Sequence, residues 1–444
     1  MIPHRLLPLS ASFFLAASIF AGHAQAAPEE VLTDIRNRTD AVEQQLITWR
    51  RDIHQHPELG GQETRTAALV AEHLRELGME VQTEVGRTGV VGILKGGQPG
   101  PTVALRADMD ALPIEEPDGL PFASQATGTY FGDETPVMHA CGHDAHTAML
   151  MAAAEVLTEM KDNLPGTVMF IFQPAEEGSS LVRPGEGKSW GAELMLEEGL
   201  FKDHKPEAIF AVHVMPGKAG SLSWRTGASL ASSDMLEINV NGKQGHGGMP
   251  WNTVDPIVAS AQVIMGLQPV VSRKANLTKS PAVVTIGSVH GGSGPNIVPE
   301  RVEMTGTIRT YDEDVRAQVG RDIKTSAEKI AESAGATAEV SIIPMYPPTV
   351  NDADLVEMMA PVLEQVAESG TSQAPLQGAA EDFAFYAQEV PGFYFFLGVT
   401  PPDQDPAEAA PNHNPEFFVH EEALVVGARA MASMAVSYLH QSEE

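Results

Sequence analysis

The chain's single cysteine, Cys141, lies in a short motif of residue types that bind metals. The motif reads Met138-His-Ala-Cys-Gly-His-Asp-Ala-His-Thr147, and an alanine-rich run with helical spacing, residues 148–160, follows it. The thiolate of Cys141 and the imidazole of His143 suit zinc or a similar divalent ion. A small buried cysteine beside an ordinary histidine explains the same pattern. The motif alone leaves both interpretations open.

Further potential ligands follow the apolar segments 102–107, 167–172 and 208–214, which have the length of buried strands. Helical patterns alternate with these segments. They therefore predict an α/β fold, with a mixed, largely parallel sheet flanked by helices on both faces. In such sheets ligand sites lie beyond the carboxyl ends of the strands. The acidic and histidine side chains at those ends are Asp108, Asp110, Glu176, Glu177 and His213.

A later segment of the same domain adds His413, which follows a predicted strand over residues 392–399. The candidate metal ligands are then Cys141, His143, Glu177, His213 and His413. One zinc ion takes about four ligands, and a catalytic zinc takes three from the protein. Five ligands therefore favour two divalent ions that share a bridge. We also expect the Cys141 thiol to ionise readily, because a metal and a helix N-terminus both favour the thiolate.

The adjacent carboxylates Glu176 and Glu177 need different roles, because successive side chains of an extended segment point to opposite sides. One can bind metal, while the other takes the proton of a metal-activated water and later gives it to a leaving amine. By itself a Glu-Glu pair between Pro174 and Gly178 is more typical of a solvated loop. Only the accompanying cysteine and histidines favour catalysis.

The first 26 residues have the pattern of a secretory signal peptide, with Arg5, an apolar run over residues 6–21 and an Ala24-Gln-Ala26 cleavage site. An uncleaved anchor is the alternative, and the lack of a following basic stop-transfer segment disfavours it. We expect a secreted, periplasmic protein with no membrane partner after cleavage. A lone exported thiol is open to oxidation, so export favours Cys141 as a metal ligand.

The charge balance argues against nucleic acid as a partner. The chain has 28 basic and 59 acidic residues and a net charge of -31 at pH 7, and acidic groups repel phosphates. These acids are spread along the chain, as on a solvated surface. With 43% hydrophobic residues, the chain can bury a large core and is long enough for at least two domains.

The middle of the chain predicts an inserted domain. Its patterns come in the order strand, helix, strand, strand, helix, strand, which is the ferredoxin-like α+β unit. Glycine-rich and proline-rich joints bracket this unit. The predicted division is a signal peptide at 1–26, a catalytic metal-binding domain formed by 27–230 and 345–444, and the inserted domain at 231–344.

Two helical patterns, residues 39–56 and 63–77, open the catalytic domain. They carry His54, His56 and His73, and no other potential ligands gather near these histidines in the sequence. We therefore expect the three side chains at the helix surfaces or ends.

The inserted domain carries three polar residues of interest. His246 lies in the glycine-rich run 242–250, Asn296 follows another glycine-rich run, and Arg309 ends a predicted strand. Singly, each is more typical of a turn or a surface. Together they can supply donors for a developing oxyanion and a cation for a substrate carboxylate.

These motifs, in this order, resemble a family of two-metal amidohydrolases typified by hippurate hydrolase, N-acyl-amino-acid amidohydrolases and indole-acetyl-amino-acid hydrolases, relatives of the glutamate carboxypeptidases. The resemblance runs from about residue 42 to residue 438. It rests on Arg51-Asp-Ile-His-Gln-His-Pro-Glu58, Arg106-Ala-Asp-Met-Asp-Ala-Leu-Pro113, Met138 to Met149, Gln173-Pro-Ala-Glu-Glu-Gly178, His213, Gly245-His246, Asn296, Gly306-Thr-Ile-Arg309, Glu381-Asp-Phe383 and His413-Asn-Pro415.

The resemblance implies a two-metal exopeptidase-like fold with the inserted domain as a lid. It implies two divalent ions, zinc, manganese, cobalt or nickel, held by Cys141, His143, Glu177, His213 and His413. Glu176 would be the general acid/base, and Asp110 would support the metal site from behind.

The resemblance also assigns roles to the inserted domain. His246 would polarise the substrate carbonyl, in some members from a partner subunit, while Asn296 and Arg309 would hold the oxyanion and the substrate carboxylate. The inserted domain is often a dimerisation surface, so a homodimer or higher homo-oligomer is implied. Two loops, 124–137 and 179–189, look longer than in typical members and flank the site, which leaves the substrate open.

The residues and the resemblance together predict a metal-dependent amidohydrolase that cleaves N-acyl amino acids or short peptides. A metallo-carboxypeptidase or dipeptidase is a close alternative. A thiol hydrolase using Cys141 with His143 or His146 would leave the other ligands unexplained. A periplasmic metal-binding protein without catalysis would have no need of Glu176.

Overall fold

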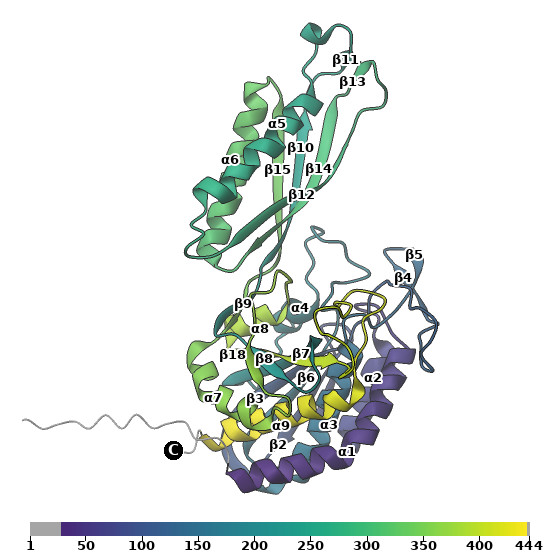
Figure 1. The fold of residues 1–444 in the computed structure, drawn as a ribbon, viewed down its shortest axis with the longest axis vertical. Coiled ribbons are helices and arrows are strands. Elements are labelled where there is room, and N and C mark those ends of the chain that lie inside the picture. Colours follow the sequence, from purple (N-terminus) through teal and green to yellow (C-terminus); the bar gives the residue numbers. More distant parts are fainter. Residues whose placement is uncertain (1–27, 442–444) are drawn as a thin grey trace, which may run out of the picture.

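The computed structural model describes residues 28–441, which fold around two separate sheets (Figure 1). The larger sheet has eight strands in the order β1-β2-β6-β3-β7-β18-β8-β17. They are β1 (Glu80–Val85), β2 (Gly89–Lys95), β3 (Gln98–Asp108), β6 (Pro165–Gln173), β7 (Ala208–Lys218), β8 (Leu222–Trp224), β17 (Thr371–Gln373) and β18 (Gly392–Thr400). Strands β6, β3, β7 and β18 pair in parallel, and β1 and β2 add an antiparallel edge. The predicted mixed, largely parallel sheet is confirmed. The predicted signal peptide lies outside the described residues.

Helices cover both faces of this sheet. One face packs against α1 (Glu29–Gln55), α2 (Thr64–Glu76), α3 (His143–Glu159), α7 (Ala353–Val366) and α9 (Leu424–Gln441), and the other against α4 (Gly191–Glu197) and α8 (Phe383–Glu389). Helix α3 is apolar on nearly all sides because it is enclosed by α1, α9 and the sheet. Helix α1 begins ten residues before the predicted start at residue 39, because Ile35 also packs into the core.

The second sheet and its two helices project from the main body (Figure 1). Its elements are β10 (Ser233–Asn241), α5 (Pro256–Pro269), β12 (Ala282–Gly291), β14 (Arg301–Thr310), α6 (Glu313–Ser333) and β15 (Thr337–Tyr346). The strands pair antiparallel in the order β12-β14-β10-β15. Every second residue of β10 is buried, because one face of the sheet packs against the helices. The predicted ferredoxin-like order of elements is present, and the exact domain boundaries stay a prediction.

A small two-stranded sheet, β11 (Gly245–His246) with β13 (Ile297–Val298), lies at the end of this part that is farthest from the main body (Figure 1). At the opposite end, β9 (Gly227–Leu230) pairs with β16 (Thr349–Asn351) where the chain leaves and re-enters the main body. The two polypeptide connections between the parts therefore run side by side.

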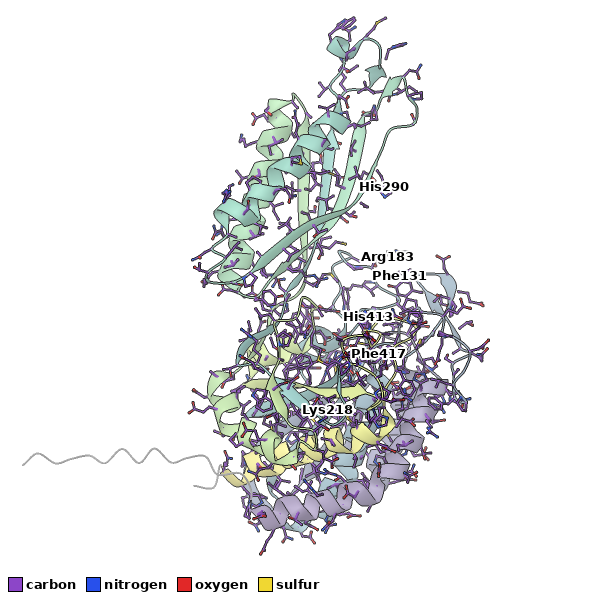
Figure 2. The ribbon with its side chains drawn as sticks, in the orientation of Figure 1. Phe131, Arg183, Lys218, His290, His413 and Phe417 are labelled. Carbon is purple, nitrogen blue, oxygen red and sulfur yellow. The ribbon has the colours of Figure 1, made fainter. Side chains whose placement is uncertain are left out.

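The two loops that look long in the sequence contact each other. The first forms a hairpin of β4 (Thr127–Tyr130) and β5 (Asp133–Pro136). The backbone N–H of Phe131 in this hairpin donates to the carbonyl of Ser180 in the second loop at 2.9 Å. The guanidinium of Arg183 lies 4.3 Å from the centre of the Phe131 ring, on the side of the main body that faces the second sheet (Figure 2).

Within the described residues, one helical segment, Glu421–Gln441, is long and apolar enough to cross a membrane. In this segment, 89% of an 18-residue stretch is buried inside the protein. This burial is what a core helix of a globular domain shows.

Candidate metal centre

The candidate ligands meet at one edge of the large sheet. Strands β3, β6, β7 and β18 run in the same direction, so the chain segments that follow them emerge together. Three groups consist only of predicted ligands and the predicted base, with donor atoms within 4.8 Å of one another: Cys141 with His143 and His213, Cys141 with Glu177 and His413, and His143 with Glu176 and Glu177. The structure thus brings together all five predicted ligands and the predicted base. Cys141 belongs to two of the groups, as a shared ligand would.

The turn that carries Cys141 requires a glycine. Gly142 has a φ of +99°, and a Cβ at this position would lie 2.3 Å from a methyl group of Val214. Helix α3 begins at the next residue, His143. Close packing of this turn against Val214 of β7 brings Cys141 within 3.4 Å of Nε2 of His213.

The histidine rings are oriented as metal ligands are. Nδ1 of His213 donates to the carbonyl of Val214 at 2.7 Å, which leaves the Nε2 lone pair facing Cys141. Nδ1 of His143 lies 3.2 Å from a carboxylate oxygen of Asp110. Nε2 of His413 lies 3.3 Å from the sulfur of Cys141 and 2.8 Å from Oε1 of Glu177.

One buried ring nitrogen of the site makes no hydrogen bond among residues 28–441. Nε2 of His143 is fully buried and makes no hydrogen bond, and its nearest carboxylate oxygens, on Asp108 and Glu176, are 3.8 and 3.9 Å away. Burial opposes a charge on this ring, but Asp108 and Asp110 outweigh it and raise the pKa of His143 to about 10. A metal cation near Nε2 would answer the same carboxylate charges as the proton does.

The thiol of Cys141 needs a cation to ionise. Burial, together with the nearby carboxylates of Glu177 and Glu176, raises its pKa well above the ordinary value. Burial and these carboxylates oppose the thiolate, so the expected ionisation depends on a bound cation and stays a prediction. A divalent cation would deprotonate the thiol outright. The orphaned imidazole nitrogen and the thiol, imidazole and carboxylate donors fit divalent metal ions.

The two adjacent glutamates differ in their environment. Burial and then the carboxylates of Glu381 and Glu177 raise the pKa of Glu176 well above its ordinary value. Burial also acts on Glu177, but a hydrogen bond from His413 outweighs it and lowers the pKa of that carboxyl. A raised pKa suits a group that takes up and releases a proton near neutral pH.

Asp110 supports the site through the backbone. Its two oxygens accept the N–H groups of Glu176 at 3.0 Å and Glu177 at 2.9 Å, and one of them faces His143. One buried carboxylate therefore orients both a ligand ring and the loop of the two glutamates.

A cavity of about 470 Å³ opens onto these side chains. Its walls include Cys141, Glu176, Glu177, His213 and His413. Arg309 also lines it, and this guanidinium makes no hydrogen bond or ion pair within residues 28–441. Figure 2 shows His413 on the side of the main body nearer the second sheet.

His246 and Asn296 do not line this cavity. Both are exposed next to β11 and β13 at the far tip of the second part. Nδ1 of His246 accepts the N–H of Gly248 at 2.9 Å. Within one chain the structure does not bring these two residues to the metal ligands.

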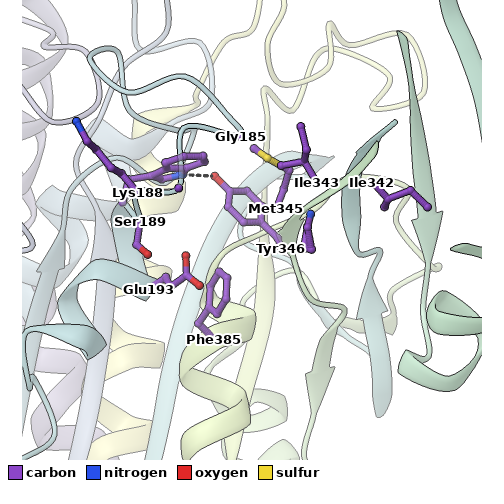
Figure 3. Close-up of a pocket in the computed structure, with 12 residues that line it drawn as sticks. Gly185, Lys188, Ser189, Glu193, Ile342, Ile343, Met345, Tyr346 and Phe385 are labelled. Carbon is purple, nitrogen blue, oxygen red and sulfur yellow. Dashed lines mark hydrogen bonds between the residues drawn. The ribbon is translucent and has the colours of Figure 1, made fainter. Parts of the chain in front are cut away.

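Two residues near the site carried no predicted role. The hydroxyl of Tyr346, at the end of β15, donates to the carbonyl of Glu176 at 2.6 Å. It also accepts from Nε1 of Trp190 at 3.1 Å, the bond that is dashed in Figure 3. The side-chain amide of Asn412 donates to the carbonyls of Cys141 at 2.8 Å and Val214 at 3.0 Å. Asn412 stands directly before His413, which was a usable signal, whereas Tyr346 lay in an apparently structural proline-rich joint.

His146 is not available as a base for Cys141. Its Nδ1 lies 2.6 Å from Oδ1 of Asp108, and its Nε2 accepts the N–H of Val214 at 2.8 Å. Both ring nitrogens are therefore occupied. This arrangement and the raised thiol pKa disfavour a thiol mechanism.

Two other histidines, His54 and His73, lie in the last turns of α1 and α2, as expected, but they are buried and not at the surface. His54 is 2% exposed and His73 is 9% exposed. The ring nitrogens of His54 lie 2.8 Å from Asp144 and 2.9 Å from Glu116, both on segments remote from it in the sequence. These partners come from tertiary packing, so neighbouring residues in the sequence did not reveal them.

Comparisons with known proteins agree with this geometry. Residues 104–437 match the model of peptidase family M20/M25/M40. The chain is 38% identical over 412 residues to thermostable carboxypeptidase 1 of Saccharolobus solfataricus, covering 92% of this chain and 99% of that one. It is 39% identical over 403 residues to N-acetylcysteine deacetylase of Bacillus subtilis, covering 90% and 98%.

A solved structure shares the whole fold. It is the Bacillus subtilis YXEP protein, described as a dinuclear metal-binding peptidase of the M20 family. The TM-score is 0.74 with 35% sequence identity, covering 90% of this chain and 99% of that chain. These relatives support the conclusion that the chain is a hydrolytic enzyme that acts on amides and binds divalent metal. The chain belongs to peptidase family M20/M25/M40.

Proposed function

We propose that this enzyme cleaves the amide bond of N-acyl amino acids of the hippurate type, or of short peptides, with Glu176 as general acid/base. The observation that carries the proposal is the contrast between two adjacent carboxylates. Glu177 pairs with His413 and has a lowered pKa, whereas Glu176 has a raised pKa and faces the same cavity. A purely metal-binding site has no need of the second group.

The residues act on the substrate in a simple order. Cys141, His143, Glu177, His213 and His413 would hold two divalent ions, which would supply polarisation of the amide carbonyl and acidification of water. Glu176 takes the proton of the attacking water and gives it to the leaving amine. Asp110 keeps the ring of His143 and the backbone of both glutamates in place. These groups account for a hydrolysis that releases a carboxylate and an amine.

Arg309 would bind the carboxylate of the amino-acid part. It lines the cavity, and Asp234, the carboxylate whose charge acts on it, is already ion-paired with Arg316 at 2.6 Å. Burial lowers its pKa, although an arginine keeps its charge at neutral pH. A guanidinium without a partner suits a planar carboxylate that arrives with the substrate.

We further propose that the protein works as a homodimer or higher homo-oligomer, with His246 and Asn296 acting at the site of a partner subunit. Large apolar side chains are exposed around the tip that carries them: Trp251 at 77%, Met249 at 49% and Ile297 at 40%. A second copy of the chain would cover these side chains. The proposed location is the periplasm, after removal of residues 1–26.

The test is a substrate and metal screen. Protein stripped with a chelator and reloaded with zinc, manganese, cobalt or nickel is assayed on acetyl, benzoyl and indole-acetyl amino acids and on dipeptides. We expect activity only with metal, and preference among the acyl groups identifies the substrate. The Glu176→Gln variant should bind metal normally and lose about two to four orders of magnitude in rate.

Glu177→Gln is the matched control, because it makes the same carboxylate-to-amide replacement at the neighbouring residue. We expect it to lose metal affinity first. Activity that survives complete metal removal would overturn the metal mechanism. Normal turnover by Glu176→Gln would overturn the assignment of the base.

A further inference from the structure

We propose that Glu63 is a positioning residue for catalysis: its buried carboxylate holds the backbone just before Glu176 in the conformation that separates the two glutamates. The inference deepens the proposed function, since it rests on Glu176 as the base. Neither the sequence motifs nor the relatives' names assign a role to Glu63.

Glu63 precedes helix α2 and is fully buried. Its Oε1 accepts the N–H of Ala175 at 2.8 Å and the N–H of Gly61 at 2.9 Å. Its Oε2 accepts the hydroxyl of Thr88 at 2.5 Å. A buried carboxylate with three donors is held firmly in one position. It can therefore hold the loop that contains Ala175.

The backbone of Ala175 is strained, so contacts from other segments must stabilise its conformation. Its φ is +53°, in the left-handed region that L-residues other than glycine rarely adopt. The residue joins Pro174 to Glu176, so its conformation sets the direction in which the two glutamates leave the strand. A strained residue persists only where surrounding contacts determine it. The hydrogen bond from its N–H to Glu63 is such a contact.

The surrounding loops fit closely around this point. A Cβ on Gly60 would lie 2.1 Å from the carbonyl oxygen of Gly178, so the turn before Glu63 packs directly on the turn after Glu177. The carbonyl of Gly60 also accepts the N–H and the hydroxyl of Ser180. Both sides of the glutamate loop are thus tied to the segment that carries Glu63.

Two buried carboxylates together accept hydrogen bonds from three consecutive backbone N–H groups. Glu63 binds the N–H of Ala175, and Asp110 binds those of Glu176 and Glu177. Only Asp110 also faces His143, a proposed metal ligand. Loss of Asp110 should therefore disturb the metals, whereas loss of Glu63 should disturb the base and leave the metals in place.

The raised pKa of Glu63 reflects the free-energy cost of ionising a carboxyl in this position. Burial, and then the neighbouring charge of Asp110, raise its pKa to about 7. A buried carboxylate this close to another is unfavourable for its own ionisation. Its position is explained by the N–H groups that it binds.

The decisive measurement compares kcat, KM and bound metal in Glu63→Ala and the wild type. We expect kcat to fall about 10–100-fold, the range for removing a partner that supports an active site from behind. KM and the metal content should stay at wild-type values. Glu63→Gln, whose amide oxygen can still accept the Ala175 N–H, should restore most of the lost kcat.

Two further variants separate positioning from a loss of stability. Thr88→Val removes a donor to Glu63 but touches no part of the glutamate loop, and it should keep kcat. Glu63→Asp keeps the charge but withdraws the carboxylate by one methylene group, and it should lower kcat with metal retained. Glu63→Asp also provides the test if Glu63→Ala does not fold.

Three results would overturn the role of Glu63: wild-type kcat in Glu63→Ala or Glu63→Asp, a parallel loss of metal, or an equal loss in Glu63→Gln and Glu63→Ala. The proposed function is checked alongside with wild type and Glu176→Gln. If those two behave as expected while the Glu63 variants keep kcat, only the positioning role fails.

Discussion

Replacing Arg106 by methionine should destabilise the protein strongly, because this arginine is the partner of three buried carboxylates. It is 1% exposed on β3. Its guanidinium donates to Asp108 at 2.5 Å and to both Glu381 and Asp382 at 2.9 Å, while Nε donates to Gln173 at 2.9 Å. The Arg106→Met variant would keep much of the volume and remove every one of these bonds.

The expected magnitude follows from the burial of the partners. Removing one member of a buried ion pair costs about 3–5 kcal/mol, because the other charge is left uncompensated. Arg106 has three such partners, none more than 2% exposed, so the loss should reach at least this range. That is a large share of a typical total stability of about 5–15 kcal/mol. We expect Arg106→Met to be barely folded at pH 7.

The assay is urea unfolding of wild type and variant at pH 7 and pH 5. Orphaned buried carboxylates have raised folded-state pKa values, so their cost is present at pH 7 and shrinks as falling pH protonates them. Arg429→Met is the control. Arg429 is equally buried at 2%, but its partners Asp40 and Glu368 have side chains 55% and 48% exposed, so water can solvate them. A loss below about 1 kcal/mol in Arg106→Met, within the range of exposed ion pairs, or one equal to that of Arg429→Met, would refute the reasoning.

Three further outcomes are expected. His54→Gln should cost more stability at pH 6 than at pH 9 in urea unfolding. Although burial opposes a charge on His54, Asp144 and Glu116 raise its pKa, so its stabilisation is complete below the unfolded-state pKa of about 6.5 and is lost as pH rises through the folded-state pKa. Equal losses at the two pH values would contradict this. Gly427→Ala should destabilise by about 1–3 kcal/mol despite the better helix propensity of alanine, because its Cβ would lie 2.1 Å from the sulfur of Met149; an unchanged or higher Tm would show that α3 and α9 can separate without cost. Chelation should lower the Tm of the wild type, since a ligand that binds only the folded state stabilises it, and the Cys141→Ser variant should show a smaller fall.

The sequence was sufficient for the architecture and the ligand types. Apolar strands and amphipathic helices alternate visibly, and the ferredoxin-like order of the middle segment follows from its periodicity alone. Glu177 follows the end of β6, and parallel strands bring such ends to one edge. His213 differs from the expectation, because β7 continues past it to Lys218. These features depend on short stretches of chain, which a sequence displays directly.

Sequence reasoning failed where burial or a remote partner decides. His54 has the spacing of a helix-surface residue, yet Asp144 and Glu116 enclose it. Tyr346 bonds to the carbonyl of Glu176, which is 170 positions away. No local pattern marks either contact, because both depend on how separate elements pack.

Residue types and spacing were enough to identify the side chains that could bind metal, the strands near them and the family to which the chain belongs. Only the tertiary structure decided that Glu176 and Glu177 have opposite pKa shifts, that Nε2 of His143 is left without a partner, and that Glu63 holds Ala175. Desolvation and hydrogen-bond geometry are set by atoms from segments far apart in the chain. They exist only once those segments have packed together.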